Sequence, residues 1–211
     1  MAGLCYNREA GHPGKCHAVP RYGEGEGGNA RRMAAVDRPQ MIVSASYRTD
    51  IPAYYTRWLL ARLAAGFCSV ANPYGGPAYR VSLAAGAVSG FVFWTRNLGP
   101  LLPELASVAA RAPFTVQFTL TGYPRLLEPG VIVPEAALAQ LGELRQRWGG
   151  RAAVWRYDPV LVSSLTPPDW HRAHFAALAR ALAGLVDEVV LSFVQPYRKT
   201  GHRLDDAARR H

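Results

Sequence analysis

Residues 113–158, PFTVQFTLTGYPRLLEPGVIVPEAALAQLGELRQRWGGRAAVWRYD, contain two strand-type segments separated by one helix-type segment. Strands are expected at 113–120 and 152–158, because both stretches are short, apolar and rich in aromatic or β-branched residues. Between them, Pro134 is placed to open a helix that the Gly149-Gly150 pair ends. A strand, a helix and a second strand in this order are typical of a βαβ unit with parallel strands.

The same alternation continues on both sides of this unit. Further strands are expected at 41–46, 89–95 and 187–194, with a helix after each of the first four strands, while 67–83 is predicted to form a hairpin. No Gly-rich phosphate loop follows the first strand, which favours a barrel over a doubly wound sheet. The predicted fold is therefore α/β, a partial (β/α) TIM-like barrel with about five parallel strands, roughly two or three βα units short of closure.

The composition is that of one globular domain. The chain has 211 residues, of which 49% are hydrophobic. Residues 1–40 are rich in Gly and Arg without an apolar run and are expected to form a disordered arm, which leaves 41–211 as the barrel domain.

Neither a membrane-spanning stretch nor a secretory signal is evident, so a soluble, cytoplasmic protein without a membrane partner is expected. Cys68 lies in an apolar run and is expected in the core.

Polar residues that follow the strands form the candidate site, because ligands of parallel βα proteins bind at the carboxyl ends of the strands. Three arginines, Arg48, Arg96 and Arg156, each follow a different strand, which favours an anionic small molecule as the ligand. The alternative is that these are ordinary solvated loop residues. The candidate ligand-binding residues are Arg48, Thr49, Asp50, Trp94, Thr95, Arg96, Asn97, Gln117, Arg156, Tyr157 and Asp158.

Five of these residues are predicted to form one polar cluster: Arg48, Asp50, Arg96, Arg156 and Asp158. Three guanidinium groups beside two carboxylates leave about one positive charge unmatched, and an unmatched charge is costly to bury. An anionic ligand would match it.

Other chemistries are less well supported. The net charge of +9 leaves nucleic acid possible as a partner, with Trp94, Tyr123 and Tyr157 available for stacking. No catalytic residue is assigned, since a GxSxG nucleophile elbow is absent. His171 and His174 have the spacing of a metal-binding pair, but no acidic residue or cysteine accompanies them on that helix face. A surface or half-buried histidine pair is therefore expected, and no metal site.

Five sequence segments, in this order, resemble the bacterial family catalogued as domain of unknown function 1848. They are SASYRTDIPAYY (44–55), NPYGG (72–76), VFWTRN (92–97), FTLTGY (118–123) and VWRYDPVLV (154–162), and the similarity runs from Met41 to about Lys199. Members of that family are similar to radical S-adenosylmethionine enzymes and to repair proteins of the spore photoproduct lyase type. The resemblance therefore implies an enzyme with an iron–sulfur cluster and S-adenosylmethionine.

The sequence departs from the family near the carboxyl end, where the resemblance implies a cysteine cluster. No cysteine follows Lys199, so no cofactor is expected in this chain. Two explanations of the missing cysteine cluster are open. The chain is a fragment of a longer enzyme, or it is a degenerate family member that binds a ligand without radical chemistry. A non-functional fragment is the remaining alternative.

Overall fold

The structure is a computed structural model, and it describes residues 5–7, 41–46, 49–71 and 76–194. The chain divides into two compact units. The first holds residues up to Trp94 together with Pro100–Thr115, and the second holds Thr95–Gly99 together with the residues from Val116 onward. Among the described residues, every helix is too short or too polar to span a bilayer.

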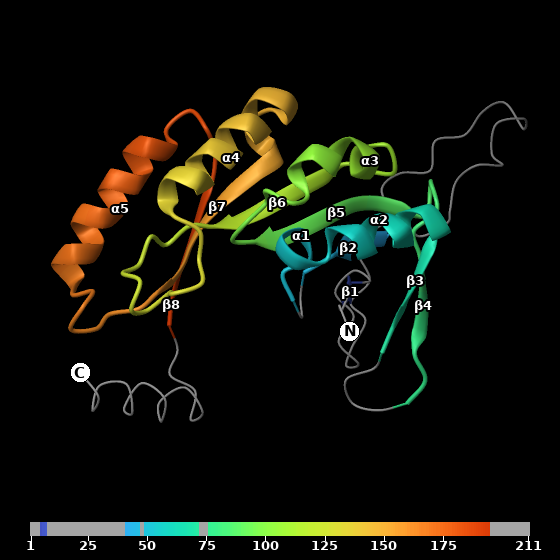
Figure 1. Cartoon of the computed structure of the whole chain (residues 1–211), viewed down its shortest axis with the longest axis horizontal. Coiled ribbons are helices and arrows are strands. Elements are labelled where there is room, and N and C mark those ends of the chain that lie inside the picture. The colour runs from blue at the N-terminus through green and yellow to red at the C-terminus, as the bar shows by residue number, and fades with distance from the viewer. Residues whose placement is uncertain (1–4, 8–40, 47–48, 72–75, 195–211) are drawn as a thin grey trace, which may run out of the picture. The chain divides into compact units, whose positions relative to one another are not determined.

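The main sheet has the strand order β1-β2-β5-β6-β7-β8 (Figure 1). Its last five strands run parallel, which confirms the α/β class and the sheet predicted for a partial (β/α) barrel. Their ends lie within about two residues of the predicted ends, in keeping with the usual uncertainty of strand boundaries. These strands are β2 (Met41–Ser44), β5 (Val88–Thr95), β6 (Phe114–Thr119), β7 (Ala153–Val160) and β8 (Val189–Phe193).

The strand β1 (Cys5–Asn7) pairs antiparallel with β2. At these three residues the chain is paired, whereas the sequence predicts a disordered arm over 1–40. The outer edge of β2 presents backbone donors and acceptors, and such an edge readily takes up a further strand. The rest of the arm lies outside the described residues, so its disorder stays a prediction.

Asp50 begins the helical part of the first unit, as its position after β2 predicts. Its carboxylate accepts a hydrogen bond from the Ala53 amide at 3.0 Å. The single helix predicted here is two helices, α1 (Ile51–Tyr54) and α2 (Thr56–Ala65), and α2 ends at Gly66 in the left-handed region.

Sequence periodicity predicts one apolar face for this helix, and the prediction is wrong at the two tyrosines. The predicted face consists of Ile51, Tyr54, Tyr55, Trp58, Leu59 and Leu63. Ile51 and Leu59 are fully buried, but 74% of Tyr54 is exposed and Tyr55 is exposed as well. Tyr55 has a non-helical backbone conformation between α1 and α2. This break changes the phase of the 3.6-residue period, so residues on its two sides no longer share one face.

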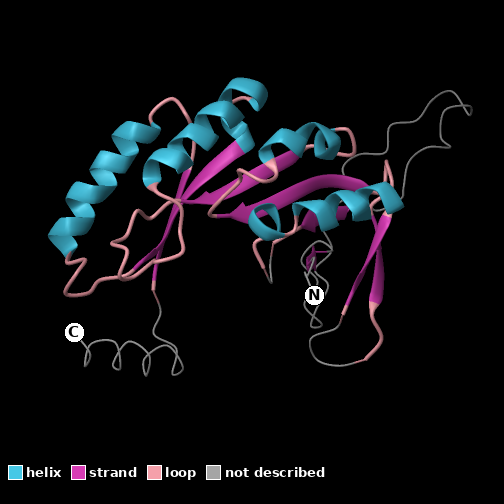
Figure 2. Ribbon diagram, in the orientation of Figure 1, coloured by secondary structure: helices cyan, strands magenta, loops and turns pink. Residues whose placement is uncertain are grey.

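The first unit also contains the predicted hairpin, formed by β3 (Phe67–Val70) and β4 (Tyr79–Ser82) paired antiparallel (Figure 2). Cys68 is fully buried in β3, as expected for a core residue. Burial raises the pKa of its thiol to about 11, although the Arg62 charge acts in the opposite direction. The helix expected after β5 is short, a 3-10 turn η1 (Leu102–Glu104) continued by α3 (Leu105–Ala109).

The second unit packs two longer helices against its strands (Figure 2). They are α4 (Pro134–Trp148), which begins at the predicted proline, and α5 (Pro168–Leu182); the 3-10 turn η2 (Gly150–Ala152) precedes β7. The Trp155 ring of β7 stacks on Phe175 of α5 at 5.0 Å between centroids, and the Tyr157 ring meets Phe175 edge-on at 5.3 Å. Because side chains alternate along a strand, Arg156 projects from the face opposite α5.

The buried face of α5 agrees with the predicted one at Leu178 and Leu182 and differs from it at three alanines. Sequence periodicity places Ala173, Ala177 and Ala181 inward, but all three are exposed. The buried residues are His171, Leu178 and Leu182. A buried imidazole is tolerated because both of its ring nitrogens find hydrogen-bond partners, and aromatic side chains bury more apolar area than alanines do.

Candidate functional site

The carboxyl-terminal half of β7 carries a buried ion pair. The Arg156 guanidinium donates from Nε to Asp158 Oδ2 at 2.9 Å, and Nη2 donates to the same oxygen. The two side chains are 14% and 20% exposed. Nη1 of Arg156 donates to Gln117 Oε1 at 3.2 Å, and the Ser192 hydroxyl donates to Asp158 Oδ1. These four residues, Gln117, Arg156, Asp158 and Ser192, are called the β7 cluster below.

Strand register explains why the β7 cluster forms. Thr119 of β6 lies opposite Arg156, and Gln117 lies opposite Val154, so Gln117 shares the face from which Arg156 projects. On the other side of β7, Val190 of β8 lies opposite Arg156, which puts Ser192 on that face too. Three neighbouring parallel strands therefore each contribute to one polar patch on the sheet face away from α5.

Arg96 forms a second ion pair close by. Its Nη1 lies 2.5 Å from Glu128 Oε1 and 3.4 Å from the Thr121 hydroxyl. The Thr121 hydroxyl donates to Glu128 Oε2 at 2.7 Å, so both carboxylate oxygens are used. This pair ties the segment after β5 to the long loop after β6.

Asp158 is ionised near neutral pH. Burial alone would raise the pKa of its carboxyl group, but hydrogen bonds from Ser192 and Arg156, together with the charges of Arg156 and Arg96, lower it below the ordinary value. The effect of Arg96 shows that the two ion pairs interact electrostatically. A carboxylate with a lowered pKa is a poor general base, so its role here is to hold and orient Arg156.

The predicted five-residue cluster is present in part. Arg96, Arg156 and Asp158 come together within the second unit. Asp50 and Thr49 belong to the first unit, where Asp50 caps α1. Arg48 lies outside the described residues. The predicted excess of one positive charge is not found in the described part of the cluster. Glu128, which the sequence analysis missed, pairs with Arg96, so two guanidinium groups face two carboxylates.

Three other candidate residues have structural partners. The Thr95 hydroxyl accepts a hydrogen bond from the Asn97 amide at 2.9 Å. The Asn97 side-chain oxygen accepts from the Gly99 amide and from Gln140 of α4. Tyr157 is 1% exposed, and its hydroxyl lies 2.8 Å from His171 Nδ1. These contacts place Thr95 and Asn97 in a folded turn, and Tyr157 on the helix side of β7, away from Arg156.

Trp94 is the remaining candidate. It ends the part of β5 that belongs to the first unit and is 45% exposed. Its neighbours Phe93 and Thr95 are buried, as alternation along a strand predicts.

Both histidines of α5 form hydrogen bonds within the second unit, and His171 is buried. His171 Nε2 lies 2.9 Å from the Leu161 carbonyl oxygen, which can only accept, so Nε2 carries a proton. His174 Nε2 lies 2.9 Å from the Thr121 carbonyl oxygen and donates to it in the same way. Both rings thus face the strands and loops of the second unit.

The described residues do not fit an iron–sulfur cluster. Within them, no three His, Cys, Asp or Glu side chains converge. The thiol of Cys68 is buried, and its raised pKa opposes the thiolate form that a metal requires.

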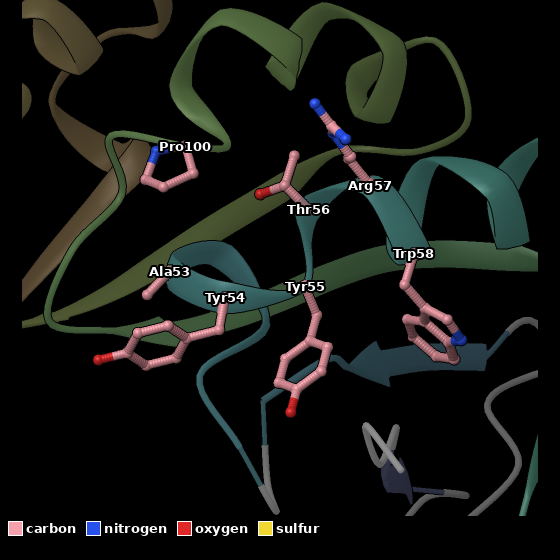
Figure 3. A pocket seen from close by; sticks show the side chains of 7 residues that line it. All are labelled: Ala53, Tyr54, Tyr55, Thr56, Arg57, Trp58 and Pro100. Atoms are coloured by element: carbon pink, nitrogen blue, oxygen red, sulfur yellow. The ribbon is translucent and has the colours of Figure 1, made fainter.

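A pocket of about 390 Å³ lies in the first unit at the junction of α1 and α2. Figure 3 shows the Tyr55 and Trp58 rings on one side of the backbone and the Arg57 side chain on the other. Among the described residues that line this pocket, Arg57 alone is charged. The sequence analysis missed the pocket because it assigned both tyrosines to the buried face. The lining residues are Ala53, Tyr54, Tyr55, Thr56, Arg57, Trp58 and Pro100.

Comparison with known proteins gives a family without an assigned reaction. No curated protein and no solved structure matches the sequence. The family model described as a domain of unknown function, DUF1848, matches residues 42–211, and the chain therefore belongs to that family.

Proposed function

We propose that the second unit binds a small anionic molecule at the carboxyl ends of β6, β7 and β8, with Arg156 and Arg96 as the binding cations. The observation that carries this proposal is the Arg156–Asp158 pair, half-enclosed on the sheet face opposite α5. Parallel βα proteins bind their ligands at this end of the strands.

The energetics of the two ion pairs support a role in binding. Taking a guanidinium and a carboxylate out of water costs several kcal/mol, so a buried pair adds little to stability compared with apolar side chains of the same size. The Arg156–Asp158 pair, with side chains 14% and 20% exposed, is therefore poorly explained by stability alone. Burial costs less for the Arg96–Glu128 pair, because the Arg96 side chain is 32% exposed, so this pair gives weaker support. Asp158 and Glu128 fix the planes of the two guanidinium groups, and a fixed guanidinium loses less entropy when it binds an anion.

Nucleic acid is less well supported as a partner. Two of the three aromatic residues available for stacking are engaged inside the second unit: Tyr157 is buried, and the Tyr123 hydroxyl is hydrogen-bonded to the backbone. Only Trp94 of the three is largely exposed. Radical S-adenosylmethionine chemistry, which the family resemblance implies, has no set of iron ligands among the described residues.

Calorimetric titration of the full chain with inorganic phosphate and with malonate tests the proposal. We expect saturable binding of at least one anion, with an affinity on the order of micromolar to millimolar. Arg156→Gln and Arg96→Gln should each weaken binding by about tenfold or more. Arg172→Gln is the matched control, because Arg172 is 72% exposed in a surface pair with Asp169 on α5, and it should bind like the wild type.

Two results would contradict the proposal. One is the absence of binding of either anion to the wild-type chain. The other is an equal loss of anion affinity in Arg172→Gln and Arg156→Gln, which would indicate that affinity depends on the net charge of the chain and not on a specific site. A labelled single-stranded oligonucleotide serves as a third probe: tight binding that falls steeply between about 50 and 200 mM salt would favour nucleic acid instead.

A further inference from the structure

The Tyr123 hydroxyl joins the segment after β6 to the carboxyl end of β7 and to the residue that follows it. It donates to the Pro159 carbonyl oxygen at 2.7 Å and accepts from the Leu161 amide at 2.8 Å. One phenol thus holds the backbone on both sides of Val160, directly after Asp158. Tyr123 belongs to the segment FTLTGY and Asp158 to VWRYDPVLV, so this contact connects two of the five sequence segments that carry the family resemblance.

The chain places Tyr123 through a tightly fixed turn. Gly122 has φ +60°, and a Cβ built on it would lie 2.7 Å from His174 Nε2. Glycine is therefore needed both for the backbone conformation and for the close approach of the imidazole. His174 in turn donates to the Thr121 carbonyl at 2.9 Å, and Trp155 Nε1 donates to the Leu120 carbonyl at 2.9 Å. The Leu120–Thr121 peptide is thus held by β7 and the Thr121–Gly122 peptide by α5.

The backbone segment that Tyr123 contacts, residues 159–161, also forms hydrogen bonds with side chains other than Tyr123. The Leu161 carbonyl oxygen accepts from the Thr166 hydroxyl at 2.6 Å and from His171 Nε2 at 2.9 Å. The Tyr123 ring lies 5.7 Å from the Trp170 ring and 5.8 Å from the His171 ring. Within this segment, Thr166 and His171 form hydrogen bonds only with the Leu161 carbonyl. Tyr123 also contacts Pro159, the residue bonded to Asp158.

We infer that Tyr123 is a positioning residue that fixes the Asp158 carboxylate, and through it the Arg156 guanidinium, for the anion site. Asp158 receives two donors of Arg156 on one oxygen and the Ser192 hydroxyl on the other. All of these contacts require the Asp158 backbone to stay in place, and Tyr123 holds the Pro159–Val160 peptide, which begins one residue after Asp158. The role in binding rests on the proposed function, whereas the fixing of Asp158 does not.

Tyr123→Phe tests the inference because it removes the hydroxyl and keeps the ring contacts. The readout is the pKa of the Asp158 carboxyl group, measured by NMR on protein labelled with ¹³C at aspartate carboxyls. In the wild type this pKa lies below the ordinary value of about 3.9, and in Tyr123→Phe it should move up toward that value as the donors of Arg156 and Ser192 loosen. The affinity for inorganic phosphate should fall about three- to tenfold.

Tyr157→Phe is the matched control. It removes a second buried phenol hydroxyl from the same aromatic cluster, but that hydroxyl contacts His171 on the helix side of β7 and does not touch the backbone after Asp158. The control should lose thermal stability and keep the wild-type pKa of Asp158. A purely structural role for Tyr123 predicts instead that both variants lose stability and neither changes the Asp158 titration.

The outcomes separate this inference from the proposed function. An unchanged Asp158 pKa in Tyr123→Phe overturns the positioning role, whatever the chain binds. A raised Asp158 pKa, with no phosphate binding by the wild type, supports the fixing of Asp158 and contradicts the anion site. If Tyr123→Phe does not fold, amide hydrogen exchange of the wild type decides: the Leu161 amide should be protected, and rapid exchange there would overturn the inference.

Discussion

The Arg156 guanidinium lies beside the Asp158 carboxylate, two residues further along β7, on the strand face opposite α5. This spacing suits a strand, because residues i and i+2 point to the same side. Gln117 and Ser192 complete the contacts from the two neighbouring strands. The pair therefore depends on the parallel register of β6, β7 and β8 as well as on its own two residues.

Asp158→Asn should destabilise the second unit by about 1–3 kcal/mol, because it leaves the Arg156 charge half-buried without a counter-charge. Asp169→Asn removes a carboxylate that is 86% exposed and should cost less than about 0.5 kcal/mol. Urea denaturation at neutral pH measures both free energies of unfolding. Equal losses in the two variants would show that Asp158 contributes no more than a surface charge.

Glu128→Gln should loosen the loop that joins β6 to α4. The Glu128 carboxylate accepts from Arg96 on one oxygen and from the Thr121 hydroxyl on the other. The glutamine amide is neutral and has only one acceptor oxygen, so the variant loses the ion pair and one of these two hydrogen bonds. We expect limited proteolysis within residues 121–133 to become several-fold faster. Glu143→Gln, in an exposed pair on α4, is the control and should leave the cleavage rate unchanged.

Much of the fold could be predicted because its signals are local. Each strand has an apolar or aromatic run, Asp50 caps α1, Pro134 opens α4 and Gly66 closes α2. The helix faces were harder to predict. At Tyr55 a single non-helical residue changes the phase of the period, and on α5 the hydrogen-bonded His171 is buried in place of alanines that look apolar in the sequence.

The candidate site could be predicted only in part, because its contacts join distant segments. Arg96, Gln117, Arg156 and Asp158 were found from their positions at strand ends. Glu128 lies 32 residues from Arg96 within a Gly- and Pro-containing loop, and no local pattern indicates that it folds back. Ser192 also lies near the end of a strand, but its contact with Asp158 depends on the register of β8, which the sequence does not indicate.

Gly122→Ala should be among the most destabilising single substitutions in the second unit. Alanine is strained at φ +60°, and its Cβ would lie 2.7 Å from His174 Nε2, so the expected cost is about 2–4 kcal/mol. Gly130→Ala is the control from the same loop, because a Cβ there meets nothing within 4 Å. A thermal melt of each variant measures the difference, and a Gly122→Ala chain as stable as Gly130→Ala would rule out the tight turn.

Cys68 should resist alkylation in the folded chain. Burial raises the pKa of its thiol to about 11, so very little thiolate is present at pH 8, and the side chain is shielded from solvent. Iodoacetamide treatment followed by peptide mass spectrometry should label Cys68 only after the chain is unfolded in urea. Labelling of the native chain at the rate of the unfolded chain would contradict the buried position of β3.

His174 should make the stability of the second unit fall in mild acid. Burial lowers the pKa of this imidazole below its ordinary value, the hydrogen bond to the Thr121 carbonyl opposes that effect, and the neighbouring His171 adds to it. Above about pH 6.5 the ring is neutral in both the folded and the unfolded chain, so it contributes no pH dependence. Below that pH the unfolded chain takes up the proton first, and the free energy of unfolding falls until the pH passes the lower folded pKa.

The matched variant is His174→Gln, whose amide can still donate to the Thr121 carbonyl but does not titrate. It loses the stacking contact with Trp170, at 4.3 Å between ring centroids, so it should be less stable than the wild type at every pH. Its stability should fall less steeply than that of the wild type between about pH 6.5 and 5, where one differential proton contributes up to about 1.4 kcal/mol per pH unit. Urea denaturation across this range measures the two slopes. Because the other histidines are the same in both chains, parallel slopes would mean that His174 is as easily protonated in the folded chain as in the unfolded one.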